Sequence, residues 1–196
     1  MQWDERYSEP GYAYGTEPND YLVEMAGLLP PGKLLSVAEG EGRNAAYLAQ
    51  LGHDVTAVDS SRVGMQKAEE LAQSRKLAIQ TIVADLNEYQ PGIEQWDAIV
   101  SIFCHLPVAQ RSVLHQKLVA ALKPGGVLLL EAYTPRQLQF GTGGPGSADL
   151  MMTLEALQTE LAGLQLEVAQ EIDREVNEGQ YHHGQAAVVQ ILARKA

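Results

Sequence analysis

Short apolar runs alternate with segments of helical spacing along the first two thirds of the chain. A run that begins at Lys33 reads as a buried strand, and further strands are predicted at 54–58, 78–83, 96–102 and 127–132. Between them, apolar residues spaced three and four apart predict helices at 43–50, 62–75 and 108–122. Parallel strands joined by right-handed crossovers follow from this alternation. The sequence therefore predicts an α/β fold, with helices on both faces of a mostly parallel sheet.

The two ends of the chain follow a different pattern. Residues 1–16 are aromatic and rich in turn residues, which suits a lid, and Pro18 is expected to open a helix that residues 30–32 stop. After a predicted helix at 154–161, two long strands at 167–176 and 185–193 join around Gly179. We expect a single domain over 1–196: a lid and helix (1–32), a cofactor-binding core (33–133), a Gly-rich segment (134–152) that is either a mobile lid or a plain surface loop, and a closing helix and hairpin (153–196).

The turn after the first predicted strand spells Gly-x-Gly-x-x-Ala over residues 40–45. Gly40 and Gly42 let the chain turn sharply and let a ligand approach the main chain closely. The helix that follows offers unpaired N–H groups to an anion. Such a turn suits a dinucleotide and S-adenosylmethionine (SAM) equally well, so the turn alone leaves both open.

Carboxylates follow the second and third predicted strands. Asp59, 19 residues after Gly40, can accept both hydroxyls of a ribose, and Asp85 can receive the exocyclic amine of adenine. Either carboxylate alone would serve equally well as a helix cap. Both at strand ends, in this order, favour SAM. The expected cofactor-binding residues are Ala38, Glu39, Gly40, Gly42, Asp59, Ser60, Ser61, Ala84, Asp85, Leu86, Ser101 and Ile102.

This series of landmarks resembles the class I SAM-dependent methyltransferases, which implies a Rossmann-like, seven-stranded sheet closed by an antiparallel hairpin. The motifs at 3–7, 14–19, 103–107 and 181–184 are similar to the tellurite-resistance (TehB-like) and thiopurine-methyltransferase-like small-molecule branch. The chain departs from the superfamily pattern at Ser36, where Asp is common, and at 38–39, where Ala-Glu replaces Gly-Cys or Gly-Ser. The first change is expected to orient the loop less firmly. The second places Glu39 where it would meet the methionine ammonium group of SAM, with Arg6 and Arg43 adding positive charge for the carboxylate.

Methyl transfer depends on in-line approach and exclusion of water more than on acid–base groups. His105, just past the fourth strand, and Tyr133, at the end of the fifth, are the predicted substrate-pocket and catalytic residues. Each also has a structural interpretation: His105 would bond a backbone carbonyl, and Tyr133 would pack. A soft thiol, selenium or tellurium nucleophile would need no strong base. Further residues expected near the acceptor are Cys104 (as a buried apolar side chain), Glu131, Arg174, His182 and His183.

The composition of the chain argues against several classes of binding partner. The 196 residues carry 14 basic and 25 acidic side chains, a net charge of −11 that disfavours nucleic acids. No apolar run approaches the ~20 residues that span a bilayer. A single cysteine and no secretory leader predict a cytoplasmic protein. No metal is expected, because neighbouring residues on a strand, such as His182 and His183, point to opposite faces.

The sequence therefore predicts a SAM-dependent methyltransferase acting on a small molecule. A nicotinamide-dependent oxidoreductase built on the same turn and a SAM-binding regulator without turnover stay open as alternatives. The oligomeric state and the identity of the acceptor are not predicted.

Overall fold

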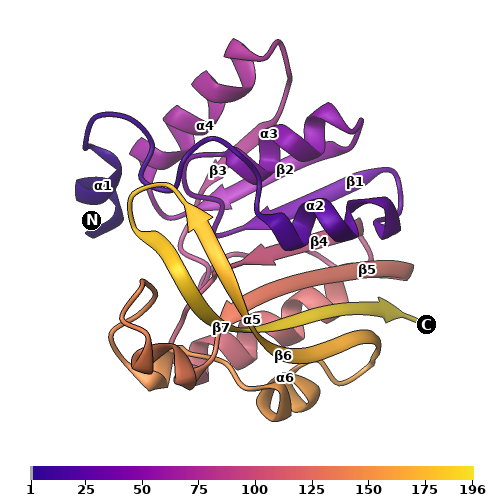
Figure 1. The fold of residues 1–196 in the computed structure, drawn as a ribbon. Coiled ribbons are helices and arrows are strands. Elements are labelled where there is room, and N and C mark those ends of the chain that lie inside the picture. The colour runs from indigo at the N-terminus through magenta and orange to yellow at the C-terminus, as the bar shows by residue number, and fades with distance from the viewer. Residues whose placement is uncertain (1) are drawn as a thin grey trace.

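The computed structural model describes residues 2–196. Within that range seven strands form one sheet in the order β3-β2-β1-β4-β5-β7-β6 (Figure 1). The strands are β1 (Lys33–Val37), β2 (Asp54–Asp59), β3 (Gln80–Val83), β4 (Trp96–Ile102), β5 (Leu122–Tyr133), β6 (Leu164–Glu178) and β7 (His182–Lys195). The first five pair in parallel, whereas β7 runs antiparallel to both β5 and β6. The predicted fold class, a mostly parallel sheet with an antiparallel C-terminal hairpin, is confirmed.

Helices cover both faces of the sheet (Figure 1). On one face lie α2 (Asp20–Met25), α3 (Arg43–Gln50) and α4 (Arg62–Ser74), and on the other lie α5 (Val108–Ala121) and α6 (Leu154–Glu160). The shorter elements are α1 (Gln2–Tyr7) and the 3-10 turns η1 (Ala26–Leu28), η2 (Pro135–Gln139) and η3 (Ala148–Leu150). Among the described residues no helix has the length and apolar character needed to cross a membrane.

The core is built by the pleat of the strands. Successive strand side chains point to opposite faces, so Leu34 packs in one apolar cluster with Leu48 of α3, and Leu35 packs in the other with Leu118 of α5. All four side chains are fully buried. Burial on both faces explains why the central strands read as continuous apolar runs in the sequence.

The N-terminal segment differs from the prediction in two ways. Residues 2–7 form the helix α1, although the sequence indicated only turns there. This short helix is anchored by Asp4, whose carboxylate accepts hydrogen bonds from the Val63 N–H at 3.2 Å and from the Ser61 hydroxyl at 2.5 Å. The helix expected from Pro18 instead begins at Asp20, because Asn19 caps it by accepting a hydrogen bond from the Leu22 N–H at 3.0 Å.

Four strands also differ from their predicted bounds. The strand β5 begins at Leu122 instead of 127, because Leu122 pairs with Trp96 across an irregular stretch of the ladder. The edge strand β3 begins at Gln80, two residues later than expected. Both strands of the C-terminal hairpin are longer than predicted, since pairing continues to Glu178 and His182, on either side of a three-residue turn. The hairpin therefore extends beyond the carboxyl end of β5 (Figure 1), and its strand β7 begins at His182.

Candidate functional site

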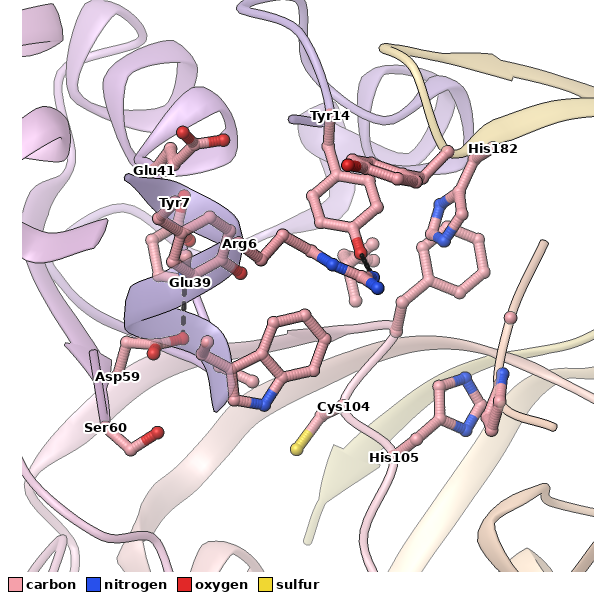
Figure 2. Close-up of a pocket in the computed structure, with 18 of the residues that line it drawn as sticks. Arg6, Tyr7, Tyr14, Glu39, Glu41, Asp59, Ser60, Cys104, His105 and His182 are labelled. Carbon is pink, nitrogen blue, oxygen red and sulfur yellow. Dashed lines mark hydrogen bonds between the residues drawn. The ribbon is translucent and has the colours of Figure 1, made fainter. Parts of the chain in front are cut away.

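A cavity of about 590 Å³ opens at the carboxyl ends of the parallel strands, where the order reverses between β1 and β4. Open α/β sheets bind their ligands at this point. Figure 2 shows side chains from the β1–α3 turn, the N-terminal segment, the end of β4 and the C-terminal hairpin facing one space. The predicted cofactor residues that line the cavity are Ala38, Glu39, Gly40, Asp59, Ser60, Asp85, Leu86 and Ile102. The others, which do not line it, are Gly42, Ser61, Ala84 and Ser101.

The β1–α3 turn is held together by Glu39. Its carboxylate accepts hydrogen bonds from the Ala45 N–H at 2.8 Å and from the Ser36 hydroxyl. The two departures from the superfamily pattern therefore bond to one another, which helps to orient the loop that Ser36 was expected to hold less firmly. Burial, partly offset by these hydrogen bonds, raises the pKa of Glu39 to about 7.

Asp59 ties the end of β2 to the same turn. One carboxylate oxygen accepts the Gly40 N–H at 2.9 Å, the bond drawn in Figure 2, and the other accepts the Ser61 N–H at 2.8 Å. Burial raises the pKa of this carboxyl group. A carboxylate offers about four acceptor sites, more than the backbone N–H groups of Gly40, Ser60 and Ser61 occupy. The predicted ribose contact is therefore compatible with the bonds that Asp59 already makes.

Two of the predicted cofactor residues support the frame of the site. A Cβ on Gly42 would lie 2.5 Å from the Cβ of Ala68, so this glycine is required for the close packing of α3 on α4. Ser61 caps α4 by accepting a hydrogen bond from the Gly64 N–H at 3.0 Å. Gly42 does not line the cavity and its Cβ side faces a helix, so a contact of its main chain with the cofactor stays a prediction. Ser61 therefore supports the start of α4 and does not line the cavity.

The adenine-side carboxylate lies at the rim of the cavity. Asp85 is exposed and accepts hydrogen bonds from the Asn87 N–H at 2.9 Å and from the Asn87 side-chain amide at 2.8 Å. Leu86 beside it is buried and also lines the cavity. An exposed acceptor next to an apolar side chain matches what an adenine ring needs at its edge and its face.

An aromatic wall forms the other end of the cavity. Phe103 stacks on Tyr133 with ring centroids 4.5 Å apart, and His105 stacks on the same tyrosine at 5.7 Å. His182 meets Phe103 edge-on at 5.0 Å and lies 4.6 Å from Tyr14. Phe103 is held in an unusual conformation, with φ of 53°. The sequence prediction placed Tyr133, His105 and His182 here but gave no role to Phe103 or Tyr14.

His105 lines this wall with both ring nitrogens already bonded. Nδ1 donates to the Leu150 carbonyl at 2.9 Å, and Nε2 accepts the Tyr133 N–H at 3.3 Å. Burial lowers the pKa of His105 to about 4, so the ring is neutral at ordinary pH. These bonds match the structural interpretation of His105 and leave neither nitrogen free to accept a proton.

Two other nearby groups that titrate, Tyr133 and Cys104, are also poor bases. Burial raises the pKa of the Tyr133 hydroxyl above its usual range. The Cys104 thiol is buried, which raises its pKa to about 12 and agrees with its predicted role as a small apolar residue. None of the three side chains His105, Tyr133 and Cys104 can therefore remove a proton at neutral pH.

The N-terminal segment roofs the cavity, which is why Trp3, Tyr7 and Tyr14 line it. The guanidinium of Arg6 donates to the Tyr14 hydroxyl at 3.0 Å and lies 4.5 Å above the ring of Tyr181 (Figure 2). Lys67 of α4 holds the segment down through the carbonyls of residues 9 and 11 and the Glu41 carboxylate at 2.9 Å. The loop at 143–146 lines the opposite side of the cavity.

A buried polar network joins the roof to the hairpin. Glu131 pairs with Arg174 at 2.5 Å and accepts a hydrogen bond from the Asn19 amide at 2.9 Å. Asn19 also donates to Glu178 at 2.8 Å, and Arg43 pairs with Glu178 at 2.7 Å. Glu131 and Arg174, which were expected beside the acceptor, instead lie behind the cavity lining and fix the N-terminal segment to β5 and β6.

Two further expectations concern histidines and metals. His183 is exposed, whereas His182 is buried and lines the cavity, as opposite faces of a strand require. Within residues 2–196 no group of three or more His, Cys, Asp or Glu side chains could hold a metal ion.

Residues 34–126 match the family model of a methyltransferase domain. Over 80 residues the chain is 35% identical to a probable S-adenosyl-L-methionine-dependent methyltransferase, TehB of Haemophilus influenzae, a match that covers 41% of this chain and 28% of the relative. The crystal structure of TehB from Haemophilus influenzae superposes with a TM-score of 0.74 at 23% identity, covering 91% of this chain and 62% of that one. Residues 34–126 thus belong to the methyltransferase-domain family, and the predicted likeness to class I SAM-dependent methyltransferases is confirmed.

A third likeness, to a protein solved in a study of the conversion of a disulfide bond into a thioacetal group during echinomycin biosynthesis, has a TM-score of 0.77 at 20% identity and covers 95% of this chain and 84% of that one. At this identity the likeness concerns the fold alone. The chain spans less than half the length of the curated relatives it matches. SAM is the cofactor of this family. The methyl acceptor does not follow from these similarities. The nicotinamide alternative is disfavoured by the same findings.

Proposed function

We propose that the protein transfers the methyl group of SAM to a small-molecule acceptor through a soft nucleophilic atom, such as that of a thiol, selenium or tellurium compound. One observation carries this proposal: a single cavity joins strand-end carboxylates at one end to an aromatic wall at the other. When bound, SAM supplies a methyl group on a sulfonium sulfur, which is already activated for displacement.

The carboxylate end of the cavity fits the cofactor. Asp59 would bind the ribose hydroxyls and Asp85 the adenine amine, each from the end of its own strand. Glu39 would meet the methionine ammonium group, and the N-terminus of α3 would attract the methionine carboxylate. Gly40, with φ of 65°, keeps the turn free of a side chain on the cavity side.

The aromatic end of the cavity supports a small, soft acceptor. Polarizable sulfur makes favourable contacts with aromatic rings such as Phe103 and Tyr133. Arg6 projects a positive charge into the same space (Figure 2), which favours an acceptor that reacts as an anion. The roof at 2–15 and the loop at 143–146 enclose this end and exclude water from it.

Cofactor binding is tested by calorimetry with SAM and with NAD. Asp59→Ala should lower SAM affinity by about 2–4 kcal/mol, roughly 30- to 1,000-fold, because a buried acceptor of the ribose and the turn is removed. Asp54→Ala, at the exposed start of the same strand, is the matched control and should bind like the parent. If the protein bound NAD more tightly than SAM, the assignment of SAM as the cofactor would be wrong. If Asp59→Ala bound SAM like the parent, Asp59 would not be the ribose contact.

Turnover is tested with thiol, selenite, tellurite, amine and hydroxyl acceptors of similar size, with products followed by mass spectrometry. We expect methylation of the soft acceptors. A protein that binds SAM tightly yet methylates none of them would be better described as a SAM-binding regulator.

A further inference from the structure

His182 occupies the centre of the aromatic wall. It is the first residue of β7, and its ring lies 4.6 Å from Tyr14, 5.0 Å from Phe103 and 5.3 Å from Tyr133, measured between ring centroids. Figure 2 shows the ring projecting from the hairpin toward the space that Tyr14 and Arg6 also face. His182 therefore contacts the part of the cavity that the acceptor would enter.

One ring nitrogen of His182 is buried against a carboxylate. Nδ1 has no hydrogen-bond partner within residues 2–196, and it lies 3.5 Å from Oε2 of Glu178. Glu178 is itself fixed by Arg43 at 2.7 Å and by Asn19 at 2.8 Å. A rigid carboxylate behind an imidazole selects the tautomer with its proton on Nδ1, which leaves Nε2 as an acceptor. Catalytic hydrogen bonds are often long before substrate binds and shorten in the complex.

The charges around the pair keep it in the state that a base needs. Burial alone would raise the pKa of Glu178, but His182 and Arg43 outweigh it and hold that pKa at about 2, so the carboxylate is ionised. Burial lowers the pKa of His182, with Glu178 opposing, so the ring is neutral before substrate binds. The charged or titratable groups that face this ring are Glu178, Arg43, Arg6, His105, Tyr14 and Tyr133.

We propose that His182, oriented by Glu178, accepts the proton of a methyl acceptor that binds in its protonated form. The inference rests on the proposed function and adds the missing proton acceptor to the same cavity. For a thiol, the S–H bond breaks, the proton forms a bond to Nε2 and the electron pair stays on sulfur. That pair then forms the bond to the methyl carbon while the methyl–sulfonium bond breaks toward the cofactor sulfur. The imidazolium that results is paired with Glu178 and later returns its proton to solvent.

This role separates two kinds of acceptor. A thiol with an ordinary pKa of about 8.5 is mostly protonated at pH 7 and needs a base, whereas an acceptor that is already ionised does not. His105 cannot substitute, because Leu150 and Tyr133 occupy both of its nitrogens. The Tyr14 hydroxyl is also engaged, because its oxygen accepts a hydrogen bond from Arg6.

The first test compares His182→Gln with the parent on two thiols, benzyl thiol and 4-nitrothiophenol, which is ionised at neutral pH. We expect about a 10²–10⁴-fold loss of kcat/KM for benzyl thiol and a small loss for the nitro compound. His183→Gln, the exposed neighbour, is the matched control and should behave like the parent. Equal losses on both thiols would overturn the proposal and leave His182 a packing residue.

The second test needs no turnover. Benzyl thiol is bound to the complex with S-adenosylhomocysteine, and its ionisation is followed by the ultraviolet absorbance of the thiolate as pH is raised. In the parent the thiolate should form at lower pH than in His182→Gln, and Glu178→Gln should lie between them, because the imidazolium loses its paired charge. Identical titrations in the parent and His182→Gln would overturn the proposal. If the parent binds SAM but methylates no thiol, selenite or tellurite acceptor, the proposed function fails, while this titration still decides the role of His182.

Discussion

A Cβ placed on Gly40 would lie 2.7 Å from the hydroxyl oxygen of Tyr7. The same tyrosine ring lies 2.9 Å from where a Cβ on Gly64 of α4 would be. Tyr7 is almost fully buried by these contacts. The helix α1 therefore rests directly on the turn that holds Gly40. It can approach so closely because Gly40 and Gly64 have no side chains that would collide with Tyr7.

Gly40→Ala is expected to weaken SAM binding by at least about tenfold, because the new methyl group displaces Tyr7 and lifts the roof in addition to straining a positive φ. Calorimetry measures the affinity, and the fluorescence of Trp3, which stacks on Tyr7 at 5.7 Å, reports the position of α1. Gly52→Ala is the matched control, since Gly52 also has a positive φ, 94°, but no atom lies within 4 Å of its added Cβ.

The contact with Tyr7 can be separated from backbone strain. In a Tyr7→Ala background, Gly40→Ala should cost no more than Gly52→Ala, because nothing remains for the methyl group to meet. If the two glycine variants already match in the parent background, the steric explanation is wrong.

Much of the frame could be predicted from the sequence. The bounds of α3 and β4 agree with those expected, because a glycine turn before the one and polar residues before the other mark where their apolar patterns begin. The helix α1 could not be predicted. Six residues are too few to form a stable helix in isolation. This helix is held by the hydrogen bond between Asp4 and Val63 of α4 and by the packing of Tyr7 against Gly40.

The site could be predicted only in part, for a similar reason. Asp59 and Asp85 reach it because each ends a strand, and that position is visible in the sequence. The bonds of His105 depend on Leu150, 45 residues further along, and the partner of His182 is visible only once β6 and β7 are paired in register. Local patterns do not contain these long-range contacts.

Glu160 joins α6 to α5 and should dominate the acid sensitivity of that face. Its carboxylate lies 2.7 Å from Arg111 and 2.7 Å from His115. Burial alone would raise the pKa of Glu160, but hydrogen bonds from His115 and Arg111 hold it at about 2. Because this is below the unfolded value of about 4.3, the ionised group stabilises the fold above that pH, and its contribution is lost as pH falls toward 2.

Glu160→Gln should lower the free energy of unfolding by about 3–5 kcal/mol at pH 7, because Arg111 is left buried without its counter-charge. The difference from the parent should shrink below about pH 4. Urea unfolding over a series of pH values measures both, with Glu155→Gln on the exposed side of α6 as the control. A difference that stays constant down to pH 2 would show that the pairing is not responsible.

His105→Ala should reduce methyl transfer modestly while leaving SAM affinity nearly unchanged, because it frees the segment around Leu150 and the Tyr133 backbone. Since the pKa of His105 is lowered to about 4, its ring is neutral above that pH. The ratio of parent to variant rates should therefore be flat from about pH 5 to 9. A ratio that changes near pH 6.5 would mean that His105 titrates during the reaction and that its hydrogen bonds do not hold.

Glu39 should make SAM binding depend on pH. Its pKa is raised to about 7 by burial, so in the free protein below that pH the carboxyl group is largely protonated. An ammonium group favours the ionised form, so binding at pH 6 must expel a proton, whereas binding at pH 8 need not. SAM affinity should therefore rise as pH increases through about 7 and then level off.

Calorimetry at pH 6 in buffers of different ionisation enthalpy should detect the release of close to one proton on binding, and almost none at pH 8. Glu39→Gln keeps the shape of the side chain but cannot ionise, so its affinity should be lower and independent of pH over this range. Glu24→Gln, on the exposed side of α2 away from the cavity, should retain the parent's pH dependence. If the parent binds SAM equally well at both pH values, or if Glu39→Gln binds as tightly as the parent, Glu39 does not meet the ammonium group and serves only to fold the turn through Ser36 and Ala45.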